Sequence, residues 1–164
     1  MEIFIFDKII RILRKDHFMI NYVVDGNLLE APANHYKVIT VNTVGVMGKG
    51  LAKSASEKFP DLLDCYRSEL KNGLDVGKPR FVVANNHKFI LFATKMNWRN
   101  PSHFSWIENG MINLIQQLEK VDPAVIHMPK LGCGLGGLFW GDVHDVIVDN
   151  FKKANPRYEL VLYV

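Results

Sequence analysis

The stretches that decide the fold read VNTVGVMGKGLA over residues 41–52 and PKLGCGLGGLFW over residues 129–140. Seven of the 12 glycines in the chain lie in 45–50 and 132–137. Each stretch follows a short apolar run and leads into a helical pattern, and a strand–glycine loop–helix unit points backbone N–H groups at an anion. The two stretches therefore predict two phosphate-binding loops at one edge of a sheet, with two ordinary turns as the alternative.

The rest of the chain alternates apolar runs with helical patterns, which predicts a three-layer α/β/α domain. We expect six strands at Met19–Val24, Tyr36–Asn42, Arg80–Ala84, Phe89–Ala93, Ala124–Met128 and Tyr158–Val164. We expect helices at Gly48–Lys58, Asp61–Lys71, His103–Lys120 and Gly141–Lys153. Because Asn85-Asn86 favours a hairpin, the sheet should be mixed and not purely parallel.

Residues 1–18 are predicted to form an N-terminal helical extension before a domain over 19–164. Ile3, Phe6, Ile10 and Leu13 recur at spacings of three and four, which is typical of an amphipathic helix packed on the flank of the domain. A helix on a membrane surface is the alternative. The segment lacks the continuous apolar centre and small-residue cleavage site of a signal peptide.

The composition is that of one globular domain: 164 residues, 48% hydrophobic and 23% charged. It excludes disorder, collagen and a disulfide scaffold. The two cysteines and six histidines show no metal-ligand spacing, so we expect no metal and no cofactor. The net charge of +3 tolerates a polyanionic partner without requiring one. No apolar run reaches the length of a membrane span, so we expect a cytoplasmic protein.

Two common nucleotide-binding motifs do not fit the glycine stretches. Gly50 follows Gly48-Lys49 where a P-loop needs Ser or Thr, and Thr43 stands where its first glycine should be. The stretch 132–136 lacks the dinucleotide-binding spacing and comes after the fifth predicted strand. A nucleotide diphosphate remains the expected ligand, but a P-loop or Rossmann enzyme is not expected.

Two further stretches accompany the two glycine stretches: GNLL over 26–29, and ATKMNWR over 93–99 followed by Pro101-Ser102. Together these four stretches resemble the macrodomain family of ADP-ribose binders. Within that family the chain is most similar to the DarG-type subgroup, which removes ADP-ribose from DNA. The similarity runs from about residue 19 to the C-terminus and implies the macrodomain fold. Many macrodomains place an Asp for adenine where this chain has Asn27. The resemblance implies ADP-ribose contacts at Gly26, Asn27, Leu28, Thr43, Val46, Met47, Gly48, Lys49, Gly50, Thr94, Leu131, Gly132, Cys133, Gly134, Leu135, Gly136 and Gly137.

The resemblance also implies catalytic residues. Lys95 lies just past the fourth predicted strand, at the edge that carries the glycine loops. It matches the catalytic lysine of the subgroup, which engages the anomeric carbon of the distal ribose. Whether it acts as a nucleophile or as an electrophile stays open. Asn42, at the end of an earlier strand, would reach a ribose hydroxyl. Cys133 is expected to be a small filler beside the ligand.

One departure from a related glycohydrolase concerns the target. The enzyme that acts on modified glutamate has a general-base aspartate in the second loop, where this chain has Gly136. This difference favours a modified nucleobase over a modified glutamate. Trp98 and Arg99 would stack on a base and meet a phosphate, with packing of Trp98 on the following helix as the alternative.

The sequence thus predicts an ADP-ribosyl glycohydrolase that acts on thymidine in single-stranded DNA through Lys95. An ADP-ribose 1″-phosphate phosphatase and a non-catalytic ADP-ribose-binding module are the alternatives. We expect a monomer without a membrane partner, working in a bacterial cell or in a host cell infected by phage.

Overall fold

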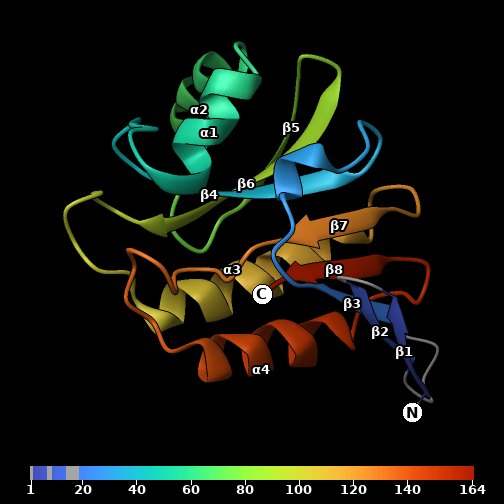
Figure 1. Cartoon of the computed structure of the whole chain (residues 1–164). Coiled ribbons are helices and arrows are strands. Elements are labelled where there is room, and N and C mark those ends of the chain that lie inside the picture. Colours follow the sequence, from blue (N-terminus) through green and yellow to red (C-terminus); the bar gives the residue numbers. More distant parts are fainter. Residues whose placement is uncertain (1, 7–8, 14–18) are drawn as a thin grey trace.

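The computed structural model describes residues 2–6, 9–13 and 19–164. Within these residues, eight strands form one mixed sheet in the order β1-β2-β3-β8-β7-β4-β6-β5 (Figure 1). The strands are β1 (Glu2–Phe6), β2 (Ile9–Leu13), β3 (Met19–Val23), β4 (Tyr36–Asn42), β5 (Arg80–Ala84), β6 (His87–Lys95), β7 (Val125–Met128) and β8 (Glu159–Tyr163). The six predicted strands are all present as β3 to β8, and the mixed α/β fold is confirmed.

Helices cover both faces of this sheet, as the three-layer prediction requires. One face carries α1 (Gly50–Lys58), α2 (Leu62–Lys71) and the 3-10 helix η1 (Leu28–Glu30), and the opposite face carries α3 (Phe104–Leu118) and α4 (Trp140–Phe151) (Figure 1). Each face has its own apolar core. Ile90 and Phe92 of β6 belong to the core under α3 and α4, whereas Phe89 and Leu91 belong to the core under α1 and α2. Neighbouring residues of a buried strand face opposite sides, which explains why the predicted strands are apolar almost throughout.

Three neighbouring strands of the sheet position the site. β7, β4 and β6 lie side by side and run parallel, so their carboxyl ends meet at one edge. Three segments leave that edge: loop 1 (residues 43–49) after β4, residues 96–103 after β6, and loop 2 (residues 129–139) after β7. Residues 96–103 are here called the Lys95 loop, after the last residue of β6 that precedes them. Figure 1 shows these segments together at one end of the molecule.

The predicted hairpin joins β5 to β6. The two strands are antiparallel, with Ala84 opposite His87. Asn85 and Asn86 take φ values of 51° and 62°, which match the two left-handed positions of a type I′ turn. The turn prediction is therefore confirmed in its backbone geometry.

The helix predicted over residues 1–18 is wrong for the parts that the structure describes. Residues 2–6 and 9–13 form β1 and β2, which pair with each other, and β2 pairs with β3. Both segments are rich in Ile and Phe, residues that favour strands, and a continuous apolar run satisfies a spacing of three and four by accident. Pairing of β2 with the edge of β3 then selects the strand conformation. The domain boundary at residue 19 stays a prediction.

Candidate functional site

A cavity of about 500 Å³ opens where β4, β6 and β7 end. Its size suits a ligand of several hundred daltons. The predicted site residues that line it are Asn42, Val46, Gly48, Lys49, Gly50, Thr94, Lys95, Trp98, Gly132, Gly134, Leu135 and Gly136. Most of the predicted phosphate loops and the predicted catalytic lysine therefore share one cavity.

Loop 1 is held by side chains from outside the loop. The amide nitrogen of Asn42 donates to Val46 O at 2.8 Å, and its Oδ1 accepts from Val44 N at 3.1 Å. The hydroxyl of Tyr66 lies 2.5 Å from Asn42 O and 2.8 Å from its Oδ1, and it accepts from Gly45 N at 3.1 Å. Burial raises the pKa of Tyr66, so the phenol keeps the proton that it donates. Since both amide atoms of Asn42 have partners, its contact with a ribose hydroxyl stays a prediction.

Backbone N–H groups at the end of loop 1 and the start of α1 lack acceptors. Among the described residues, no acceptor is recorded for the N–H groups of 47–52, and the first helical bond is donated by Lys53 N to Lys49 O. Lys49 is the N-cap of α1, and its side chain makes no capping hydrogen bond. Unpaired N–H groups at a helix start, beside a lysine, form a site for an anion.

Loop 2 is held mainly by its own backbone. Cys133 N donates to Lys130 O, Gly137 N to Gly134 O, and Leu138 N to Gly132 O, at 3.0 to 3.2 Å. In these bonds the carbonyl oxygens of Lys130, Gly134 and Gly132 are the acceptors. In the part of the chain that the structure describes, the N–H groups of 134–136 have no recorded acceptor. Loop 2 is thus a second segment with N–H groups available to an anion, as predicted from the glycines.

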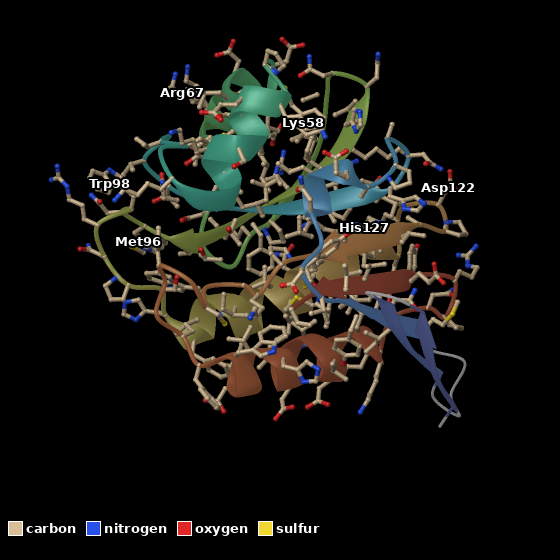
Figure 2. All side chains as sticks on the ribbon, viewed as in Figure 1. Lys58, Arg67, Met96, Trp98, Asp122 and His127 are labelled. Carbon is tan, nitrogen blue, oxygen red and sulfur yellow. The ribbon has the colours of Figure 1, made fainter. Side chains whose placement is uncertain are left out.

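Lys95 connects two of the three segments. Its Nζ donates to Leu135 O of loop 2 at 2.9 Å and to Trp98 O of the Lys95 loop at 3.3 Å. The amine therefore stays at the cavity wall between these carbonyl groups. Figure 2 shows Trp98 and Met96 at the same end of the sheet, far from His127 in its interior.

The backbone at Gly136 has no room for a side chain. A Cβ built there would lie 2.4 Å from Gly132 O and 2.4 Å from Ser102 Oγ. Ser102 N also donates to Gly136 O at 3.0 Å, which holds loop 2 against the start of α3. Of the residues lining the cavity, none is Asp or Glu. An aspartate at position 136 would not fit this loop.

The place of Cys133 beside the ligand stays a prediction. The thiol is half-buried, donates to Leu131 O at 3.4 Å, and does not line the cavity. Burial raises the pKa of this thiol, which keeps it in the protonated, weakly nucleophilic form.

Three predicted ADP-ribose-binding residues, among them Asn27 with its predicted adenine contact, lie outside the cavity. Asn27 is exposed, and its Oδ1 accepts from Leu29 N at 3.0 Å as the N-cap of η1. Leu28 is buried in the core under α1 and α2. Gly26 lies against Tyr163, because a Cβ there would be 3.2 Å from that ring. Adenine contacts at these positions stay predictions.

Five other predicted residues support the cavity without lining it. Thr43 Oγ1 donates to Met96 O at 2.9 Å and so ties loop 1 to the Lys95 loop. Met47 and Leu131 are buried core residues, and Gly137 takes a left-handed φ of 78° in loop 2. Arg99 lies over the Trp98 ring at 4.7 Å from its centroid.

Some residues that build the site carry no local sequence signal. Tyr66 comes from α2, 24 positions after Asn42, and no motif points to it. Lys130 stands at the start of the second glycine stretch, where its charge was the available signal. The cavity-lining residues that sequence reasoning missed are Thr40, Val41, Leu51, Ala52, Pro129 and Lys130.

Two features are absent from the described residues. No group of three or more His, Cys, Asp and Glu side chains there is arranged to hold a metal ion. None of the helices in this part of the chain combines the length and apolar character needed to cross a bilayer.

Comparison with proteins of known sequence gives relatives that act on DNA. The DNA ADP-ribosyl glycohydrolase of Mycobacterium tuberculosis (strain ATCC 25618 / H37Rv) is 38% identical over 144 residues, which cover 84% of this chain and 40% of that protein. The enzyme of the same name from Thermus aquaticus (strain ATCC BAA-2747 / Y51MC23) is 39% identical over 125 residues, 73% of this chain and 34% of that protein. The chain spans at most about 40% of the length of these curated relatives.

Solved structures agree with this result. The macrodomain of Mycobacterium tuberculosis DarG superposes with a TM-score of 0.81 and 36% identity, covering 89% of this chain and 97% of that one. The structure of Thermosipho africanus DarTG in complex with ADP-ribose gives 0.72 and 30%, covering 87% of this chain and 41% of that one. The model of the Macro domain family matches residues 38–147, which is more than half of the chain. The predicted resemblance is confirmed, and the chain belongs to the Macro domain family.

Proposed function

We propose that this protein is an ADP-ribosyl glycohydrolase that removes ADP-ribose from a modified nucleobase of DNA, with Lys95 as its catalytic residue. The observation that carries the proposal is the position of the Lys95 amine, which lies on the wall of a cavity bordered by two segments with unpaired N–H groups. The names of the two curated relatives at 38% and 39% identity support the same activity.

ADP-ribose would bind with its diphosphate between loop 1 and loop 2. The unpaired N–H groups of 47–52 and 134–136 would bind the phosphate oxygens, helped by the positive end of α1. Lys49 and Lys130 line the same cavity and add positive charge. In this arrangement the distal ribose lies toward Lys95, and the remaining part of the ligand leads toward Asn27.

The proposed reaction breaks the bond between C1″ of the distal ribose and the base. Water supplies the hydroxyl that ends on C1″, and the base leaves with a proton, so the products are ADP-ribose and unmodified DNA. In one role, the neutral Lys95 amine attacks C1″ and forms a covalent intermediate that water then hydrolyses. In the other role, the positively charged Lys95 stabilises the departing base. Both roles need the amine close to C1″.

The proposed target is thymidine in single-stranded DNA. The lack of space for a side chain at Gly136 supports a nucleobase target, because the aspartate that acts on modified glutamate does not fit in this loop. Trp98 is exposed at the cavity, with Arg99 over its ring, and this pair would stack on a base and meet a phosphate. We propose that the protein acts on this target as a monomer in the cytoplasm.

The test is release of ADP-ribose from an ADP-ribosylated thymidine oligonucleotide. We expect release by the unchanged protein and at least a 100-fold slower reaction with Lys95→Ala, since the group that acts at C1″ is lost. Lys53→Ala is the control, because Lys53 is an exposed lysine of α1 that does not line the cavity. Equal rates for Lys95→Ala and the unchanged protein would remove Lys95 from the mechanism.

The same assay separates the remaining alternatives. Release of phosphate from ADP-ribose 1″-phosphate without any loss in Lys95→Ala would favour the phosphatase. Binding of ADP-ribose without turnover of either substrate would favour the non-catalytic module. Addition of cyanoborohydride during turnover would attach ADP-ribose to Lys95 if the amine is a nucleophile, and mass spectrometry would locate the adduct.

A further inference from the structure

Exposed apolar side chains gather at the mouth of the cavity. Nine large apolar residues are exposed among the residues that the structure describes, and six of these lie on the three segments around the cavity. These six, here called the apolar rim, are Val44, Val46, Met96, Trp98, Leu135 and Phe139. Leu135 and Phe139 are 72% and 73% exposed. Burying large apolar groups is favourable, so a concentration of exposed ones marks a binding surface.

Each of the two aromatic rings of the rim has a contact with a neighbouring residue. A Cβ at Gly141 would lie 2.6 Å from the Phe139 ring, so the missing side chain lets this ring rest on the start of α4. The Trp98 ring has the Arg99 guanidinium on one side. A ring that already rests on a neighbour loses less freedom when a base stacks on it than a ring without contacts does.

Lys95 lies between two members of the rim. Its Nζ contacts the carbonyl oxygens of Trp98 and Leu135, whose side chains are both exposed. A substrate attached to a longer chain and reacting at Lys95 must therefore pass over the rim. The neighbours of the reacting nucleotide are connected to it covalently, which places them beside these apolar groups.

The charge around the mouth selects the class of partner. Lys49, Lys95 and Lys130 line the cavity, and none of the lining residues is acidic. Since the ADP-ribose group itself would occupy these lysines, Arg99 over the exposed Trp98 ring is the cation at the rim. Apolar surfaces beside a cation match a single nucleic acid strand, because its bases stack on the former while its phosphates pair with the latter. A folded protein seated on the rim would close the cavity to substrate.

We propose that the apolar rim binds the nucleotides on either side of the modified one, as unpaired bases. This inference rests on the proposed function and deepens it: the enzyme recognises a single strand of several nucleotides, in preference to an isolated modified nucleoside or a duplex.

The test compares kcat/KM for three substrates: ADP-ribosylated thymidine, a single-stranded oligonucleotide that contains it, and the same oligonucleotide annealed to its complement. We expect the single strand to exceed each of the other two by about 10-fold or more, as one stacked base contributes. Equal values for nucleoside and single strand, or for duplex and single strand, would overturn the proposal.

Two rim residues that do not line the cavity give the sharpest variants. Phe139→Ser and Met96→Ser should each lower kcat/KM for the oligonucleotide about 5- to 10-fold and leave the nucleoside value unchanged. Ile112→Ser on α3 and Val83→Ser on β5 are the controls, since these residues are 49% and 63% exposed on elements that do not line the cavity. A loss that is equal for both substrates, or that the controls share, would overturn the proposal.

A binding measurement distinguishes failure of the proposed role of the rim from failure of the proposed activity. If the protein hydrolyses none of the substrates, the proposed function is wrong, and fluorescence anisotropy with unmodified oligothymidine still tests the surface. Binding that Phe139→Ser weakens at least 3-fold, and Ile112→Ser does not, supports the rim. Absence of oligothymidine binding at low salt, or binding that Phe139→Ser leaves unchanged, would overturn it.

Discussion

Loop 1 and loop 2 offer the same kind of backbone to a ligand but are held in different ways. Loop 1 depends on side chains that reach it from β4 and α2: the Asn42 amide, the Tyr66 hydroxyl and Arg67, whose Nε donates to Gly45 O at 3.1 Å. Loop 2 depends on hydrogen bonds within its own backbone and on close packing against Ser102. Loop 1 should therefore fail when a side chain is removed, and loop 2 when one is added.

The largest expected effect on ADP-ribose binding comes from Gly136→Ala. The new Cβ would overlap Gly132 O and Ser102 Oγ, so loop 2 must move and its N–H groups lose their alignment. We expect the Kd for ADP-ribose to rise at least about 100-fold, which corresponds to roughly 2.7 kcal/mol, as measured by calorimetry.

Gly134→Ala is the matched control for the fold of loop 2. No heavy atom lies within 4 Å of a Cβ at that position, so the melting temperature should stay within about 1 °C of the unchanged protein, whereas Gly136→Ala should lower it by several degrees. Similar melting temperatures for all three proteins would contradict the account of loop 2.

A smaller effect is expected from Tyr66→Phe. The ring stays packed, but Gly45 N loses its acceptor and Asn42 loses a donor. A buried group left without a partner costs about 1–3 kcal/mol of unfolding free energy, and we expect the Kd for ADP-ribose to rise about 10-fold as loop 1 loosens. Urea unfolding and calorimetry measure the two quantities.

Tyr158→Phe is the control that separates a loss of stability from a change in the conformation of loop 1. The Tyr158 hydroxyl donates to Leu118 O and Val121 O, away from the cavity. This variant should lose a similar unfolding free energy and keep its affinity for ADP-ribose. If both tyrosine variants bind equally well, side-chain support of loop 1 is not what positions its N–H groups.

The smallest effect on binding is expected from mild acid, which acts on the buried side chain of His127, whose recorded hydrogen bonds go to His35 and Tyr163 and to neither loop. His127 bonds His35 at 2.9 Å and Tyr163 at 2.8 Å, and burial, together with nearby His35 and Lys37, lowers its pKa to about 4. An unfolded histidine titrates near 6.5, so the unfolded chain binds more protons between these values and stability falls as the pH drops through this range.

Between pH 6.5 and 5 we expect this histidine to reduce the unfolding free energy by about 1.6 kcal/mol, with His127→Gln showing a flatter profile. The Kd for ADP-ribose should change less than about 2-fold over the same range, because neither loop is held by a histidine. An affinity that fell in parallel with stability would show that the loops and the sheet interior do not respond separately.

The sequence predicted those parts of the fold in which local pattern and tertiary pairing agree. The six strands β3 to β8, the four helices and the turn at Asn85-Asn86 each carry a signal within a few residues. The helix predicted over 1–18 failed because its apolar residues fit either period, and only pairing with β3 selects strand.

The site shows the same division. The two glycine stretches and Lys95 were visible because strand ends and glycines mark them along the chain. Tyr66 was not, since its contact with Asn42 depends on how α2 packs over β4. Nor could spacing show that Ser102 fills the space behind Gly136.

The crowding behind Gly136 has an evolutionary consequence. A single-base change in a glycine codon can encode aspartate, so a carboxylate in this loop is genetically one step away. Sterically it is not, because Ser102 and the Gly132 carbonyl occupy the required volume. A lineage that moved toward acid-assisted chemistry would have to reshape the Ser102 side first, and the order of mutations would matter: the carboxylate is deleterious alone and becomes accessible only in a rearranged background.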